Sequence, residues 1–148
     1  MLLATGVSYS QTVYQVGSRT HNGGIVFSID TQNNTVSEMI VINGRYTYAE
    51  AIRMVQQWAG WRIPTISELT AIYNNLHRRE LYHFFQEGRR MGWVWSSTAD
   101  NLDWQQTVNF NQAPFSNIWV SAQSRGSRIH LIVVHTFRNI PENRIQMW

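Results

Sequence analysis

The sequence predicts an α+β domain, in which two helices pack on antiparallel β-sheets and the second half is rich in loops. Three observations predict this class. Two helix-start signals lie in the middle of the chain, at residues 47–50 and 65–68. Runs of alternating apolar residues precede and follow them. The 148 residues include no Cys, so no disulfide frames the fold, and a domain of this length can bury an adequate core without one.

The segment before the helices is rich in strand-forming residues. Alternation predicts a strand over 12–16, and the β-rich run 23–30 predicts a second one. A polar turn then leads into a third strand over 36–42, so the second and third strands form a hairpin. The pair Asn43-Gly44 is a further turn signal.

Each helix begins with a capping box, in which a Thr side chain and a Glu three residues later satisfy the first free amides. Thr47 and Glu50 supply the first box, and Gly60 marks the end of that helix. Thr65 and Glu68 supply the second box. The apolar stripes that follow at helical spacing are Ala51, Ile52, Val55 and Trp58 in the first helix, and Ile66, Leu69, Ile72, Tyr73 and Leu76 in the second.

The stretch GWRIPTISEL, residues 60–69, joins the two helices. Pro64 biases the residue before it to an extended conformation, so the chain enters the second helix at a fixed angle. Trp61 and Ile63 alternate and are expected to face the core. Arg62 then faces outward, where it can clamp a carboxylate or backbone carbonyls. We interpret the stretch as structural, with a ligand contact by Arg62 as the alternative.

Residues 78–90 are expected to form a short helix and then a basic loop. Strands are predicted over 93–97, 104–110, 117–122 and 129–137. Alternation in the second of these places four side chains on one face, namely Trp104, Gln106, Val108 and Phe110. The last run is apolar at consecutive positions, which is typical of a central strand that is covered on both faces.

Composition excludes several classes of chemistry. All twelve basic residues are Arg, so Schiff-base chemistry and a phosphate-loop Lys are excluded along with thiolate catalysis. The arginines are scattered, with doublets at Arg78-Arg79 and Arg89-Arg90, and they predict a solvated face or a preference for an acidic or sulfated ligand rather than for nucleic acid. No stretch approaches ~18 apolar residues, so no membrane span is predicted. No motif of a hydrolase, P-loop or dinucleotide enzyme is present, and we expect no enzymatic activity.

Two clusters of residues are candidates for a metal site. The first cluster is His77, Glu80 and His83, whose spacing differs from that of the zinc motif. Two histidines six residues apart also point in different directions on a helix. We therefore expect these histidines to lie on the surface. Asp100 and Asp103 offer oxygen ligands in a loop and are weak candidates for calcium. Asp is also an ordinary turn residue, so we expect no metal and no cofactor.

The segment 97–128 is rich in amide, hydroxyl and indole groups, which suit non-covalent recognition. Aromatic faces stack on sugar rings or peptide side chains, and amides make directional hydrogen bonds. The candidate ligand-binding residues are Asn101, Trp104, Gln105, Asn109, Asn111, Phe115, Asn117, Trp119 and Arg125. The alternative is a polar strand face with Trp104 and Trp119 in the core.

Four stretches carry a resemblance to a known family. They are YQVGSRTHNGGIVFSID (14–30), YAEAIRMVQQWAGWRIPTISELTAIYNN (48–75), WVWSSTADNLDWQQTVNF (93–110) and LIVVHTF (131–137). In these stretches the chain resembles the C-terminal domain family of bacterial collagen-like adhesins, long described as a domain of unknown function. The element W-R-[IL]-P-T-x-x-E-L followed by W-S-S-T is the more specific part.

The resemblance implies a C-type-lectin-like fold and a surface or secreted module that binds rather than catalyses. It assigns a structural motif to Trp61, Arg62, Pro64, Thr65, Glu68 and Trp95. The last strand departs from the family, which tends to carry Arg where this chain has Ile132 and His135. The calcium motifs of sugar-binding C-type lectins are not present, and fold analogy alone does not give function.

These observations predict three segments: 1–13, an export-signal remnant or edge strand; 14–138, the domain; and 139–148, a tail. We expect a non-enzymatic recognition module, outside or on the surface of a bacterium, that binds a glycan or protein on another surface through 97–128. The alternative is a structural or assembly subunit of a phage tail, pilus or surface fibre. In that case the N-terminal strand and the tail with Trp148 would contact copies of the chain or other fibre partners.

Overall fold

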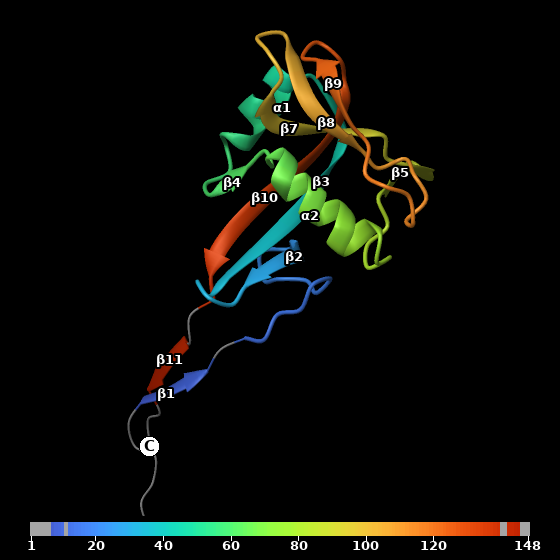
Figure 1. The fold of residues 1–148 in the computed structure, drawn as a ribbon. Coiled ribbons are helices and arrows are strands. Elements are labelled where there is room, and N and C mark those ends of the chain that lie inside the picture. Colours follow the sequence, from blue (N-terminus) through green and yellow to red (C-terminus); the bar gives the residue numbers. More distant parts are fainter. Residues whose placement is uncertain (1–6, 11, 140–141, 146–148) are drawn as a thin grey trace, which may run out of the picture.

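The computed structural model describes residues 7–10, 12–139 and 142–145, with side chains over 12–139. Its body is a seven-stranded sheet, and Figure 1 shows α2 (Ile66–Ile72) lying across it. The strands in order are β2 (Ile25–Asp30), β3 (Thr35–Tyr46), β10 (Ile129–Arg138), β7 (Trp93–Ala99), β8 (Trp104–Asn109) and β9 (Val120–Ser124), with β4 (Trp61–Arg62) paired to β10. The predicted α+β class is confirmed.

The sheet is antiparallel except at one junction. β10 pairs antiparallel with β3 and with β4, whereas β10 and β7 run parallel and meet at His130 and Val94. The expectation of purely antiparallel sheets is therefore wrong at this place. Parallel neighbours need a long crossover, and the chain supplies it between them as the hairpin β8–β9 and its loops.

β10 is a central strand of the sheet, and both of its faces are covered. Ile132 and Val134 join the core beneath α2, while Leu131 and Val133 join a second core beneath α1 (Tyr48–Val55). Successive side chains of a strand point to opposite faces, so consecutive apolar residues serve two cores at once. The prediction of a central strand over 129–137 is confirmed.

Both predicted helices are present and both capping boxes form, but the first helix ends at Val55 rather than at Gly60, so Trp58 lies outside it and is exposed. Thr47 accepts a hydrogen bond from the amide of Glu50, and the Glu50 carboxylate accepts one from the amide of Thr47 at 2.9 Å. Thr65 and Glu68 repeat the arrangement at the start of α2. α2 continues into a π-helical turn (Tyr73–His77), so that its apolar stripe extends to the buried Leu76.

Two features of the N-terminal half differ from prediction. Residues 12–16 do not form a strand, because the chain bends at Val16–Gly17, where Gly17 adopts a φ of 95°. The predicted turn at Asn43-Gly44 is also absent, since β3 runs through it to Tyr46. Gly44 has a φ of 101° and lies where the register between β3 and β10 shifts, so this glycine serves a bulge.

The segment 78–90 contains no helix, so that prediction is wrong. β5 (Phe85–Gln86) and β6 (Arg89–Arg90) form a small hairpin instead. Its two turn residues, Glu87 and Gly88, have φ values of 53° and 74°, as the tight hairpin turn with two left-handed residues requires. The strand predicted over 117–122 begins only at Val120.

A separate two-stranded ribbon brings the two ends of the described chain together. β1 (Val7–Ser10) pairs antiparallel with β11 (Glu142–Ile145), apart from the main sheet. The predicted terminal segments 1–13 and 139–148 therefore pair with each other as strands where they are described. Trp148 lies outside the described residues. Within the described part of the chain, no helix is long and apolar enough to cross a membrane.

Candidate functional site

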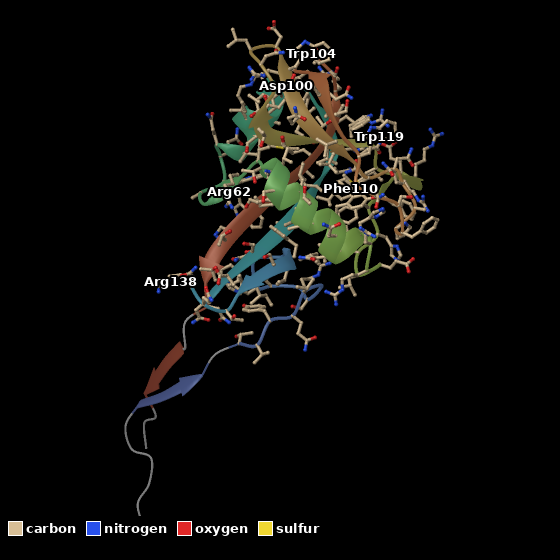
Figure 2. All side chains as sticks on the ribbon, viewed as in Figure 1. Arg62, Asp100, Trp104, Phe110, Trp119 and Arg138 are labelled. Atoms are coloured by element: carbon tan, nitrogen blue, oxygen red, sulfur yellow. The ribbon has the colours of Figure 1, made fainter. Side chains whose placement is uncertain are left out.

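The predicted ligand-binding residues fall into two separate places. Figure 2 shows Trp104 and Asp100 together at the end of the β7–β8 hairpin, with Trp119 elsewhere on the sheet. Trp104 lies opposite Ser124, whereas the backbone of Trp119 accepts a hydrogen bond from the amide of Asn109, five residues further along β8. At the usual rise of a strand the two indoles are about 17 Å apart along β8. They form two surfaces, which we call the tip and the flank.

The tip is a tight turn closed by its own side chains. The Asn101 Oδ1 accepts hydrogen bonds from the amides of Asp103 at 2.9 Å and Trp104 at 3.1 Å. Gln106 donates to the Asp100 carboxylate at 2.7 Å. These contacts fix the turn and leave the indole of Trp104 44% exposed, beside the exposed Leu102.

The acidic residues of the tip serve the turn in this structure. No group of three or more His, Asp or Glu side chains suited to a metal ion occurs among the described residues. Asp100 and Asp103 therefore supply at most part of a calcium site, and the Asp100 carboxylate already accepts from Gln106. This geometry suits a structural turn better than a cation cage, which takes 6–8 oxygen ligands.

Two of the predicted ligand residues are structural. Gln105 is only 1% exposed, and its side chain donates to the carbonyl of Ser96 at 3.0 Å. Its Oε1 accepts from Arg125, whose guanidinium also reaches the carbonyl of Asn101 and lies over the ring of Tyr48. The prediction that Gln105 contacts a ligand is wrong, because the side chain is buried. The Arg125 guanidinium therefore connects the tip to α1 through these contacts.

The flank holds the other candidates. Trp119 is 56% exposed and packs edge-on against Trp93, with ring centroids 5.3 Å apart. Phe115 is 84% exposed, and Asn117 is exposed beside it. Asn109 uses its Oδ1 to accept from the amide of Asn111 at 2.7 Å, so that its role is to shape the loop.

The loop that carries the flank is anchored from the end of α2. His77 donates through Nε2 to the carbonyl of Gln112 at 2.8 Å, and Tyr73 donates to that of Ser116 at 3.1 Å. The prediction of a surface His77 is wrong, because the ring packs among Tyr73, Phe84 and Phe110. Burial lowers the pKa of His77, so a neutral imidazole holds the loop.

A basic cleft beside the flank was not predicted. It has a volume of about 970 Å³ and lies between the end of β3, the β5–β6 hairpin and the starts of β7 and β10. The charged and aromatic residues that line it are Arg45, Glu87, Arg89, Arg90, Trp93, Arg128 and His130. The cleft also takes in Asn111, which connects it to the predicted segment. In the sequence, only the doublet Arg89-Arg90 indicates this cleft, because Arg45 and Arg128 come from distant parts of the chain.

A buried polar cluster lies on β3 and β10. The Glu38 carboxylate is fully buried and accepts hydrogen bonds from Thr20, from Asn22 at 2.9 Å and from the Nδ1 of His135 at 2.7 Å. His135 stacks on Trp61, with ring centroids 5.0 Å apart. This contact pairs the imidazole of the last long strand with a buried carboxyl group.

The helix-joining stretch behaves as a structural joint. Arg62 pairs with the Glu68 carboxylate and donates to the Thr136 hydroxyl at 3.4 Å, so the predicted carboxylate clamp is confirmed. Pro64 is buried, and its carbonyl accepts from the amide of Ser97 at 2.7 Å. Trp95 is fully buried and donates to the carbonyl of Tyr46 at 2.7 Å.

Comparisons with known proteins add no relative. No protein-family model matches this sequence, and no curated protein matches it. The exposed aromatic residues and the cleft are therefore the features of the chain that bear on its function.

Proposed function

We propose that this chain is a non-enzymatic recognition module with a C-type-lectin-like fold, displayed outside a bacterial cell or on its surface, where it binds a glycan or a protein. Its resemblance to the C-terminal domains of collagen-like adhesins motivates the fold and the location. The observation that carries the binding role is the flank, where the half-exposed indole of Trp119 is held by Trp93 and by a loop anchored to α2.

An indole in this position suits recognition for two physical reasons. Trp offers a large apolar face at a low cost in side-chain entropy, because few torsions must be fixed on binding. Here the loop is already ordered by His77 and Tyr73, so binding need not order it again. A sugar ring or an aliphatic peptide side chain can pack on such a face. Trp104 at the tip offers a second, separate surface.

Replacing Trp119 with Ala should weaken ligand binding about 10-fold or more while leaving the fold intact, because the side chain is exposed and its loss opens no core cavity. The measurement is a glycan-array screen of the purified chain, run with calcium and again with chelator, followed by titration of the best ligand. Trp58→Ala, at a partly exposed indole outside both surfaces, is the matched control. If Trp119→Ala unfolds the chain, or if it binds every ligand as well as the parent does, the flank is not the site.

The chelator arm of the screen tests the tip separately. Binding that survives chelation supports calcium-independent recognition. Binding that is lost with chelator, and also lost in Asp100→Asn, would assign a calcium role to the tip.

The second candidate function is a structural or assembly subunit of a phage tail, pilus or surface fibre. The ribbon β1–β11 favours it, because a two-stranded ribbon leaves backbone groups on both edges that can pair with a neighbouring chain. The expected result is an oligomer that dissociates when residues 1–11 and 140–148 are removed, measured by light scattering after size exclusion. A monomer at every concentration, unchanged by trimming, would count against assembly.

A further inference from the structure

The basic cleft beside the flank has the composition of an anion-binding site. Four arginines line it, namely Arg45, Arg89, Arg90 and Arg128, against one acidic residue, Glu87. They come from β3, from β6 and from the turn before β10, so the fold brings them together from three distant parts of the chain. The volume of about 970 Å³ lies in the range of small-molecule sites.

Three of these arginines have no acidic partner among the residues whose side chains are described. Arg128 pairs with Glu50 at 2.9 Å. Arg45, Arg89 and Arg90 make no ion pair within the part of the chain whose side chains are described. Like charges that line one cleft repel each other, and a bound anion relieves that repulsion. Guanidinium groups are also the side chains that best match the planar forks of phosphate and carboxylate oxygens.

A buried histidine lines the cleft beside the arginines. His130 is only 7% exposed and lines the cleft, and its Nδ1 has no hydrogen-bond partner among the residues described. Burial, and then the charge of Arg45, lower the pKa of His130, so the ring is neutral at pH 7. A neutral imidazole carries one N–H, and the hydrogen bond between the ring and the backbone of Gly44 uses it, so His130 shapes the cleft and does not donate to a bound anion.

One wall of the cleft is aromatic. Trp93 lines it and is held edge-on by Trp119. An indole wall gives no binding energy to a bare inorganic ion, but it suits the apolar face of a sugar ring. The cleft therefore combines a charged end and a flat apolar surface.

We propose that this cleft binds a phosphorylated sugar, with the phosphate held by Arg45, Arg89 and Arg90 and the sugar ring against Trp93. A phosphate monoester carries about −1.5 to −2 charges at pH 7 and three acceptor oxygens, which match several cationic donors. A carboxylate is satisfied by one bidentate Arg and would leave the other arginines unpaired. This inference rests on the proposed recognition role and names a ligand class for it.

The test is calorimetric titration of the full chain with glucose 6-phosphate, glucose 6-sulfate, glucose and inorganic phosphate. We expect saturable binding of glucose 6-phosphate, about 10-fold or more tighter than that of the sulfate ester or of inorganic phosphate, because the dianion and the ring each contribute. Glucose should show no binding. Equal affinity for the sulfate ester would overturn the phosphate assignment, and equal affinity for inorganic phosphate would overturn the sugar contact.

A matched pair of double variants locates the site. Arg89→Gln with Arg90→Gln should weaken glucose 6-phosphate binding about 10-fold or more, because charged hydrogen bonds are lost. Arg78→Gln with Arg79→Gln removes the same charge from an exposed doublet outside the cleft and should leave affinity within about 2-fold. Circular dichroism checks that both variants fold. Equal losses in the two variants would mean non-specific attraction and would overturn the site.

The result separates this inference from the proposed function. If sugar phosphates do not bind while Trp119→Ala still abolishes a ligand found on the array, the recognition role stands and the cleft assignment falls. If glucose 6-phosphate binds and Trp119→Ala leaves every array ligand unaffected, the cleft stands and the flank is not the recognition surface.

Discussion

Replacing Trp95 with Ala should destabilise the domain by about 3–5 kcal/mol, the usual cost of removing a large aromatic side chain from a core. Trp95 is fully buried on β7 and packs edge-on against Tyr48 of α1, with centroids 5.4 Å apart. Its indole N–H donates to the carbonyl of Tyr46 at 2.7 Å. The substitution therefore opens a cavity beneath α1 and leaves a backbone acceptor unpaired. The measurement is urea unfolding followed by far-ultraviolet circular dichroism.

Trp104→Ala is the control for this experiment, since it removes the same side chain from the exposed tip. We expect a change of about 0.5 kcal/mol or less there, as for most surface substitutions. Equal destabilisation by the two substitutions would contradict the placement of Trp95 in the core and of Trp104 on the surface. Unfolding of Trp104→Ala alone would show that the tip turn is held by its indole.

Replacing Glu38 with Ala should cost about 3–5 kcal/mol, as is usual when one partner of a buried ionic cluster is removed. The carboxylate accepts from Thr20, from Asn22 at 2.9 Å and from His135 at 2.7 Å, so its loss orphans three donors. Thermal and urea unfolding measure the effect. Glu38→Gln keeps one acceptor oxygen at nearly the same volume and should fall between the parent chain and Glu38→Ala.

A double-mutant cycle isolates the central contact of that cluster. His135→Ala removes the hydrogen bond to Glu38 but also the stack on Trp61, so its single effect is a mixture. The coupling free energy between Glu38→Ala and His135→Ala should exceed about 1 kcal/mol, in the range for residues in direct contact. A coupling near zero would mean that the carboxylate stabilises the domain through Thr20 and Asn22 alone.

Features of the fold that depend on neighbouring residues were predictable from sequence. A capping box needs only a Thr and the Glu three residues later, so both helix starts were placed correctly. The two-faced burial of β10 was visible as consecutive apolar residues. Arg62 was expected to clamp a carboxylate, and its partner is the Glu68 of the adjacent box.

Features that depend on distant pairing were not predictable. Alternation along β8 correctly grouped Trp104 with Val108 and Phe110, yet the core covers only the last two, and Trp104 projects past it. Gln105 on the opposite face was expected to contact a ligand, but Arg125 and β7 bury its side chain. Periodicity assigns residues to a face, and only the tertiary packing decides which part of that face is covered.

The cleft was missed for a similar reason. Glu87-Gly88 is not one of the common hairpin-turn pairs, so nothing local showed that 85–90 forms a hairpin. Arg45 and Arg128 lie 83 residues apart in the chain and meet the hairpin only through the pairing of β3 with β10. A site assembled from such separated arginines leaves no motif in the sequence.

The position of β10 has a consequence for how this chain folds as it is synthesised. The strand that both cores share is made after β2, β3, both helices and the β8–β9 hairpin. Until it leaves the ribosome, the sheet lacks the strand that joins β3 to β7, and these two strands expose unpaired edges. Folding is then expected to be one late, cooperative event with slow, non-local strand pairing.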